Sequence, residues 1–102
     1  PIFTVALFTE LIMPTTFLAI KILYFAYVRE QLGTDSEALV LEGQEWTIGG
    51  LRSHLRARGG AYAQVFAVGK TVKAALNQTM VDDSAFITNE AEIAFFPPVT
   101  GG

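Results

Sequence analysis

The chain has 102 residues, of which 51% are hydrophobic and 17% charged, with seven basic residues against ten acidic ones. This length predicts a single domain, because a second one would be too small to close a core of its own. The formal net charge of -3 argues against nucleic acid as the main partner, since nucleic acid binds basic surfaces. The absence of cysteine from the sequence excludes disulfides, thiolate metal sites and thiol nucleophiles.

Residues 1–18 form an apolar N-terminal extension that is interrupted by Glu10 and Pro14. A membrane-spanning helix needs about 20 consecutive apolar residues, so these interruptions argue against one. A secretory signal peptide carries positive charge near its start, whereas the first basic residue here is Lys21. We interpret the segment as an appendage outside the core and expect no membrane contact. A membrane-tethered binding module is kept as an alternative.

From residue 19 onward, short apolar runs alternate with turn signals. The patterns predict strands over residues 19–28, 37–42, 72–77, 79–81 and 91–96, and a short helical turn over residues 26–32. A helix is expected after Thr47, whose hydroxyl suits an N-cap, and Gly59 and Gly60 should end it. Its apolar stripe consists of Ile48, Leu51 and Leu55. This order predicts an α+β fold for residues 19–96.

Side-chain alternation in the first and last strands predicts which residues face outward. Lys21 and Glu92 should avoid the core, so residues at even spacing from them, including Phe25 and Phe96, are expected on the outer face of the sheet. The inward set is then Ile20, Ile22, Tyr24, Ile93 and Phe95. Two outward phenylalanines form an apolar patch, which is typical of a partner-binding surface. Coverage by the N-terminal segment or by a loop is the alternative.

The sequence offers few residues for conventional catalytic chemistry. His54 is the only histidine and lies among arginines on the expected helix, where a solvated position is favoured. The sequence contains no paired-histidine metal motif and no phosphate-binding loop. Asp82 and Asp83 are adjacent in a turn-like stretch, so their carboxylates should point apart and serve the turn. We therefore expect no metal site and no self-sufficient enzyme.

The C-terminus offers a more specific signal. Residues 97–102 read PPVTGG, directly after the last expected strand. The prolines prevent further strand pairing, and the glycines Gly101 and Gly102 let the tip enter a narrow channel. Six extended residues span roughly 20 Å, which carries the terminal carboxylate away from the domain. An α-carboxylate becomes an acyl electrophile when it is adenylated by ATP. The expected organisation is thus an extension, a domain and a flexible tail.

Three segments carry a family resemblance: residues 20–30 (IKILYFAYVRE), 75–79 (ALNQT) and 92–102 (EIAFFPPVTGG). They resemble the small subunit of molybdopterin synthase, a sulfur carrier of the ubiquitin-like β-grasp fold. The resemblance begins near Ala19 and implies a mixed sheet packed on one main helix. The run FPPVTGG is its most specific part.

The resemblance implies that an E1-like activating enzyme uses ATP to adenylate Gly102, which is then converted to a thiocarboxylate. The tail would enter the large subunit and donate sulfur to cyclic pyranopterin monophosphate in molybdenum cofactor biosynthesis. It further implies a cytoplasmic, non-catalytic sulfur-donor subunit in a heterotetramer of two small and two large subunits. Such a subunit binds no cofactor of its own. The implied site consists of Gly101 and Gly102 at the tip, and of Phe25, Arg29, Met80, Phe96, Pro97, Pro98, Val99 and Thr100 as partner-binding residues.

The sequence departs from the family pattern in one turn. The usual Asp-Gly turn before the last strand is replaced by residues 88–91 (TNEA), so we expect Asn89 at positive φ there. Residues 58–69 match the pattern poorly. The same tail also suits a protein modifier that forms isopeptide bonds through Gly102, or the related thiamine-pathway sulfur carrier, and these alternatives remain open.

Overall fold

The computed structural model describes residues 16–43 and 45–98. Its five-stranded sheet has the order β2-β1-β5-β3-β4, in which β1 pairs parallel with β5 and the other neighbours are antiparallel. The strands are β1 (Phe17–Tyr24), β2 (Ser36–Glu42), β3 (Lys73–Leu76), β4 (Thr79–Val81) and β5 (Glu92–Phe96). The helices are α2 (Ala26–Leu32), α3 (Ile48–Arg56) and α4 (Gly60–Val65). The predicted α+β class and the mixed sheet are confirmed.

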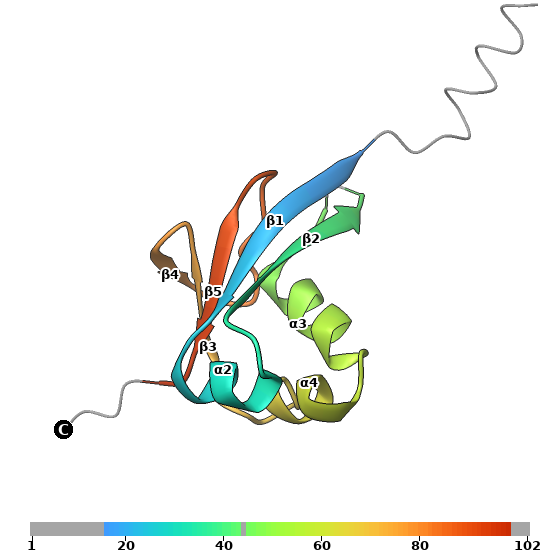
Figure 1. Cartoon of the computed structure of the whole chain (residues 1–102). Coiled ribbons are helices and arrows are strands. Elements are labelled where there is room, and N and C mark those ends of the chain that lie inside the picture. The colour runs from blue at the N-terminus through green and yellow to red at the C-terminus, as the bar shows by residue number, and fades with distance from the viewer. Residues whose placement is uncertain (1–15, 44, 99–102) are drawn as a thin grey trace, which may run out of the picture.

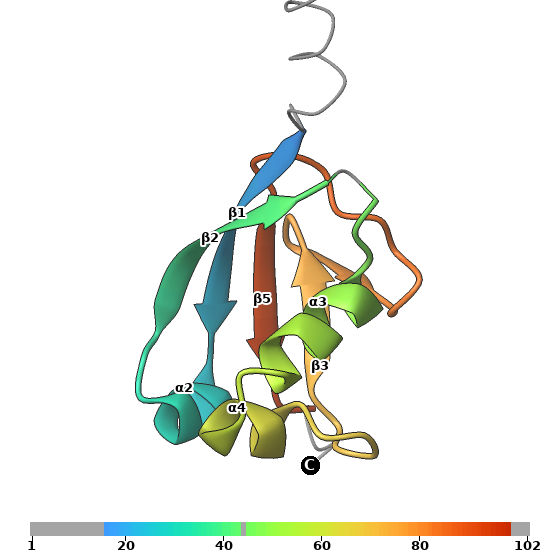
Figure 2. The same ribbon diagram turned by 90° about the vertical axis from the view of Figure 1, so that its right-hand side faces the viewer.

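The helices leave one face of the sheet open. The main helix α3 lies across one face, while α2 and α4 lie at the end of the sheet where β1 and β5 finish (Figure 1, Figure 2). In the described part of the chain, no helix covers the opposite face. We call the face toward α3 the inner face and the open one the outer face.

The main helix begins where the sequence predicts it. The Thr47 hydroxyl accepts a hydrogen bond from the Gly50 backbone N–H at 3.0 Å, which caps the helix. Gly49 lies at a close approach, because a Cβ there would lie 3.2 Å from the Cβ of Asp83, which is tighter than an ordinary contact. Glycine weakens a helix by about 1 kcal/mol relative to alanine. At Gly49 this cost is offset by the close packing of the helix against residues 82–85.

The core lies between the inner face and α3. All five residues predicted to point inward are buried: Ile20, Ile22, Tyr24, Ile93 and Phe95. The predicted stripe of α3 is fully buried as well, with Ile48, Leu51 and Leu55 at 0% exposure. Burial stabilises the fold by roughly 1.5–3 kcal/mol for each large apolar side chain. The parity assignment of the sheet is therefore confirmed.

Several boundaries differ from the sequence prediction. The first strand ends at Tyr24 and not at residue 28, because α2 begins at Ala26. The strand also begins earlier, at Phe17, and Leu18 is buried in the core, although both were assigned to the extension. Residues 1–15 lie outside the described residues. The helix α4 was not predicted, and it begins at Gly60, the second glycine of the pair that was expected only to end α3.

The turn before β5 forms differently from the prediction. The residue at positive φ is Glu90 (φ 65°), so the expectation for Asn89 was wrong. Asn89 instead uses its side chain, whose Oδ1 accepts a hydrogen bond from the Ala19 backbone N–H at 2.8 Å. The Glu90 N–H donates to the Ala19 carbonyl at 2.7 Å. These two contacts hold the turn against β1, and the residue with the left-handed conformation is Glu90, one position after the predicted Asn89.

Among the described residues, no helix has the length and apolar character needed to cross a membrane.

Candidate functional site

A row of apolar side chains crosses four strands on the outer face. Strand register places Leu23 of β1 beside Ala94 of β5, Ala94 beside Ala75 of β3, and Ala75 beside Met80 of β4. Paired residues in a sheet point to the same face, so the four side chains form a continuous strip. Met80 is 58% exposed, Leu23 and Ala94 are half-buried, and Ala75 is buried at 9% exposure. The sequence identified Met80 only through the family resemblance, whereas Leu23, Ala75 and Ala94 were missed as members of this surface.

The two predicted outward phenylalanines lie beside this strip. Phe96 follows Ala94 on the outer side of β5 and is half-buried. Phe25 directly follows β1 and is 45% exposed, and its N–H donates to the Phe95 carbonyl at 3.0 Å. Because β1 and β5 are parallel, their carboxyl ends lie at the same end of the sheet. We call Leu23, Phe25, Ala75, Met80, Ala94 and Phe96 the docking strip.

Arg29 projects from α2 near the docking strip. It lies four residues after Phe25, and its backbone N–H donates to the Phe25 carbonyl at 3.4 Å, so both residues belong to the first turn of the helix region. Arg29 is exposed, and no ion pair involves it within residues 16–43 and 45–98. The charge is therefore available to a partner.

The predicted C-terminal tail begins at the same end of the sheet. Pro97 is half-buried, Pro98 is exposed, and neither belongs to a strand. The predicted residues Val99, Thr100, Gly101 and Gly102 lie outside the described residues. The structure thus brings Phe25, Arg29, Phe96 and the root of the tail to one end of the sheet, with Met80 on the same face two strands away.

A second apolar region on the outer face was not predicted. Phe17 is 50% exposed and Val40 is 63% exposed, at the end of the sheet opposite the tail. Lys21 and Glu92, which are cross-strand neighbours, separate this region from the docking strip. The signal was present in the sequence, because alternation in β1 continues back from Lys21 to Phe17.

A polar network fixes the end of β1 that carries Phe25. The Tyr24 hydroxyl donates to Glu37 Oε1 at 2.6 Å, and the two terminal nitrogens of Arg58 donate to the Glu37 carboxylate at 2.8 and 3.0 Å. Burial, together with the bond to Glu37, holds the pKa of Tyr24 well above its usual range. Burial of Glu37 raises its pKa, but the hydrogen bonds from Arg58 and Tyr24 outweigh this, so its pKa is lowered.

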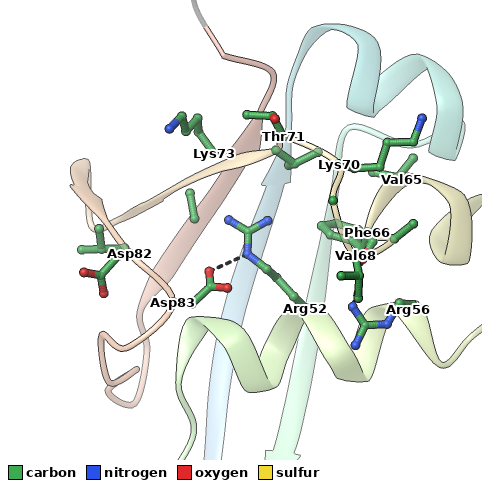
Figure 3. Close-up of a pocket in the computed structure, with 15 residues that line it drawn as sticks. Arg52, Arg56, Val65, Phe66, Val68, Lys70, Thr71, Lys73, Asp82 and Asp83 are labelled. Atoms are coloured by element: carbon green, nitrogen blue, oxygen red, sulfur yellow. Dashed lines mark hydrogen bonds and ion pairs between the residues drawn. The ribbon is translucent and has the colours of Figure 1, made fainter.

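The larger cavity lies away from the docking strip. It has about 590 Å³ and lies between α3, residues 66–72 and the β3–β4 hairpin (Figure 3). Arg52 Nε donates to Asp83 Oδ1 at 2.8 Å, and Arg56 donates to the Phe66 carbonyl at 3.1 Å. Both arginines therefore hold the walls together, while Lys70 and Lys73 extend outward (Figure 3). We assign this cavity a structural role.

The remaining sequence candidates have structural roles too. Asp82 accepts hydrogen bonds from the backbone and side chain of Ser84, which lower its pKa, whereas Asp83 pairs with Arg52. The two carboxylates thus serve separate contacts, as the turn reading predicts. His54 is exposed and packs edge-on against Trp46, with ring centroids 5.5 Å apart. Within the described ranges, no group of three potential metal ligands comes together.

Comparisons with known proteins agree on the family. The ThiS family model matches residues 22–102. The molybdopterin synthase sulfur carrier subunit of Escherichia coli is 43% identical over 83 residues, which cover 81% of this chain and 99% of that protein. The corresponding protein of Haemophilus influenzae is 41% identical with the same coverage.

Solved structures show the same ubiquitin-like β-grasp fold. The small archaeal modifier protein 1 from Methanosarcina acetivorans has a TM-score of 0.65 and 18% identity, covering 86% of this chain and all of that chain. A chain from a protein-protein complex of subunits 1 and 2 of the molybdopterin-converting factor of Helicobacter pylori has a TM-score of 0.55 and 20% identity. The match covers 83% of this chain and 100% of the Helicobacter pylori chain. With a family model across four-fifths of its length and relatives above 40% identity, the chain belongs to the ThiS family, as a homologue of molybdopterin synthase sulfur carrier subunits.

Proposed function

We propose that this protein is the sulfur carrier subunit of molybdopterin synthase and works through a thiocarboxylate on Gly102. The observation that carries the proposal is the 43% identity to such a subunit over 99% of its length. An apolar docking strip at the end of the sheet where the tail begins supports it. In this proposal the protein is a co-substrate that presents one reactive group, the carboxylate of Gly102.

The proposed chemistry takes place at the terminal carboxylate. One oxygen of the Gly102 carboxylate attacks the α-phosphate of ATP on the activating enzyme, pyrophosphate leaves, and an acyl adenylate forms. A sulfur donor at the oxidation level of sulfide then attacks the acyl carbon through its sulfur, and AMP leaves with one carboxylate oxygen, so that sulfur replaces that oxygen. In the large subunit, the thiocarboxylate sulfur attacks a carbon of cyclic pyranopterin monophosphate and an oxygen substituent of that carbon leaves. Water then hydrolyses the resulting thioester, which leaves the sulfur on the pterin and regenerates the Gly102 carboxylate for another cycle.

The tail and the docking strip divide the task between them. The strip provides affinity, because it offers exposed apolar area with Arg29 beside it, while the tail delivers the reacting atom. We expect glycine to be necessary at the last two positions, because a Cβ at either one would collide with the walls of the narrow channel that the tail must enter. We propose a heterotetramer of two small and two large subunits, and a transient complex with an E1-like adenylating enzyme, in the cytoplasm. The Helicobacter pylori structure with the same fold is described as a complex of subunits 1 and 2 of the molybdopterin-converting factor, which supports the large subunit as a partner.

Intact-mass measurement tests the proposal. The full chain is incubated with ATP, a sulfur source and the activating enzyme, and we expect a mass gain equal to the exchange of one oxygen for sulfur, located on Gly102. A chain lacking Gly102 is the matched control and should stay unmodified. Formation of lysine-linked conjugates without the thiocarboxylate would contradict the proposal and favour a protein modifier.

A further inference from the structure

A second, smaller hollow opens beside the docking strip. It has about 250 Å³ and is lined by Leu23, Tyr24, Phe25, Arg29, Asp35 and Ser36. We call it the socket. Neither the sequence patterns nor the family resemblance identified Leu23, Asp35 or Ser36 as contact residues, and the socket is separate from the larger cavity near α3.

The socket is continuous with the docking strip. Ser36 is the register partner of Leu23, so both side chains belong to the outer face. Leu23 is in turn the neighbour of Ala94 in the strip, and Phe25 belongs to the strip and to the socket wall alike. A partner that covers the strip from Met80 to Leu23 therefore reaches the socket without a gap.

The lining combines an apolar wall with a charged rim. Leu23 and Phe25 supply apolar surface, while Arg29 and Asp35 supply opposite charges. The Asp35 carboxylate accepts a bond from the Ser36 hydroxyl at 3.3 Å, but within the described residues neither Arg29 nor Asp35 takes part in an ion pair. Both charges are therefore free to pair with groups that surround an inserted side chain.

Resting on the proposed function, we propose that the socket receives one large apolar side chain of the molybdopterin synthase large subunit. An aromatic or long aliphatic side chain that enters this hollow of about 250 Å³ would displace water from the apolar surfaces of Leu23 and Phe25. Anchors of this kind, buried in a pocket and ringed by polar contacts, carry most of the affinity of protein interfaces. An acidic group of the partner next to the anchor would pair with Arg29.

The occupant is assigned to the large subunit because the socket is continuous with the docking strip and lies at the end of the sheet where the tail begins. In the proposed function the large subunit covers this strip while the tail is inserted. Arg29 and Asp35 would then help to set the register of the complex, because charge pairs across an interface contribute specificity more than affinity. Occupation by the activating enzyme alone, or by a second copy of this chain, is left as an outcome of the test.

Filling the socket tests the proposal. Ser36→Phe places a ring in the hollow from an outer-face strand position, where aromatic residues are well tolerated. We expect its affinity for the large subunit, measured by titration calorimetry on the full chain, to fall by about tenfold or more. Ser36→Leu fills less of the space and should reduce affinity less. Val40→Phe is the matched control, since it adds the same ring to the same strand and face about 13 Å away.

The outcomes separate the socket from the proposed function. Thermal unfolding of each variant reports whether the domain remains folded, and a folded Ser36→Leu keeps the test valid if Ser36→Phe unfolds. Unchanged binding by the folded Ser36 variants, while the unaltered chain binds, would overturn the socket alone. A loss seen only with the activating enzyme, or only in self-association, would overturn the assigned occupant. Failure of the unaltered chain to bind the large subunit would overturn the proposed function, and the socket assignment with it.

Discussion

Phe95 and Phe96 are neighbours in β5, but they face opposite sides of the sheet. Phe95 is fully buried and packs edge-on against Phe66, with ring centroids 4.9 Å apart, whereas Phe96 lies half-buried on the outer face beside Ala94. Apolar side chains on the inner face are buried in the core, whereas those on the outer face remain partly accessible near the start of the tail. The difference teaches that adjacent identical residues can serve stability and recognition separately.

The largest effect should come from the inner face. Phe95→Ala is expected to lower the free energy of unfolding by about 3–5 kcal/mol, because it leaves a cavity beneath α3. Phe96→Asp should change stability far less, while it weakens binding to the large subunit. Chemical denaturation of both variants measures the contrast. Unfolding of the isolated Phe96→Asp domain would show that the outer ring belongs to the core after all.

The two ends of the outer face provide the next contrast. Phe25→Asp should weaken binding to the large subunit by about tenfold or more, since it replaces an aromatic ring of the docking strip with a carboxylate that would also compete for Arg29. Phe17→Asp alters a ring of similar exposure at the opposite end and should leave binding unchanged. Titration of both variants against the same partner is the measurement. Equal losses would extend the interface across the whole outer face.

Acid sensitivity should trace to the network that holds the end of β1. The pKa of Glu37 is lowered in the folded state, so its contribution is present above the ordinary carboxyl pKa and is lost as pH falls through the folded value. Glu37→Gln should lower stability at neutral pH by about 1–2 kcal/mol and flatten the decline below pH about 4.5. Unfolding curves across that range check this. An unchanged acid slope in Glu37→Gln would assign the sensitivity to another carboxylate.

The smallest effect is expected at the turn before β5. Glu90 has φ 65°, a conformation that costs a non-glycine residue about 1 kcal/mol. Glu90→Gly should therefore stabilise the domain by several tenths of a kcal/mol, whereas Glu45→Gly, at a residue without positive φ, should destabilise it slightly. Thermal unfolding distinguishes the two. A loss of stability in Glu90→Gly would mean that the turn depends on the Glu90 side chain.

The sequence could predict the features that depend on local pattern. Alternation placed Phe25 and Phe96 outward because a one-residue shift would have buried Lys21 and Glu92. The Thr47 cap and the stripe of α3 follow from local side-chain chemistry as well. The helix α4 was missed because it starts at a glycine and has no capping side chain. Its place depends on packing against α2 and α3, which no local pattern encodes.

The socket and the docking strip illustrate a second limit. Leu23, Ala94, Ala75 and Met80 come from four strands, and only the register brings them into one row. The positive φ of Glu90 likewise depends on contacts with Ala19, some 70 residues away. Sequence patterns report faces within one strand, but the order and register of strands decide which faces adjoin.

Sulfur transfer in a reconstituted system tests the central claim most directly. The thiocarboxylated chain is mixed with the large subunit and cyclic pyranopterin monophosphate, and dithiolene formation is measured beside a chain carrying one residue added after Gly102. The account predicts product from the native terminus and none from the extended chain, with both proteins equally folded. Product from the extended chain, with trimming excluded by mass spectrometry, would contradict it.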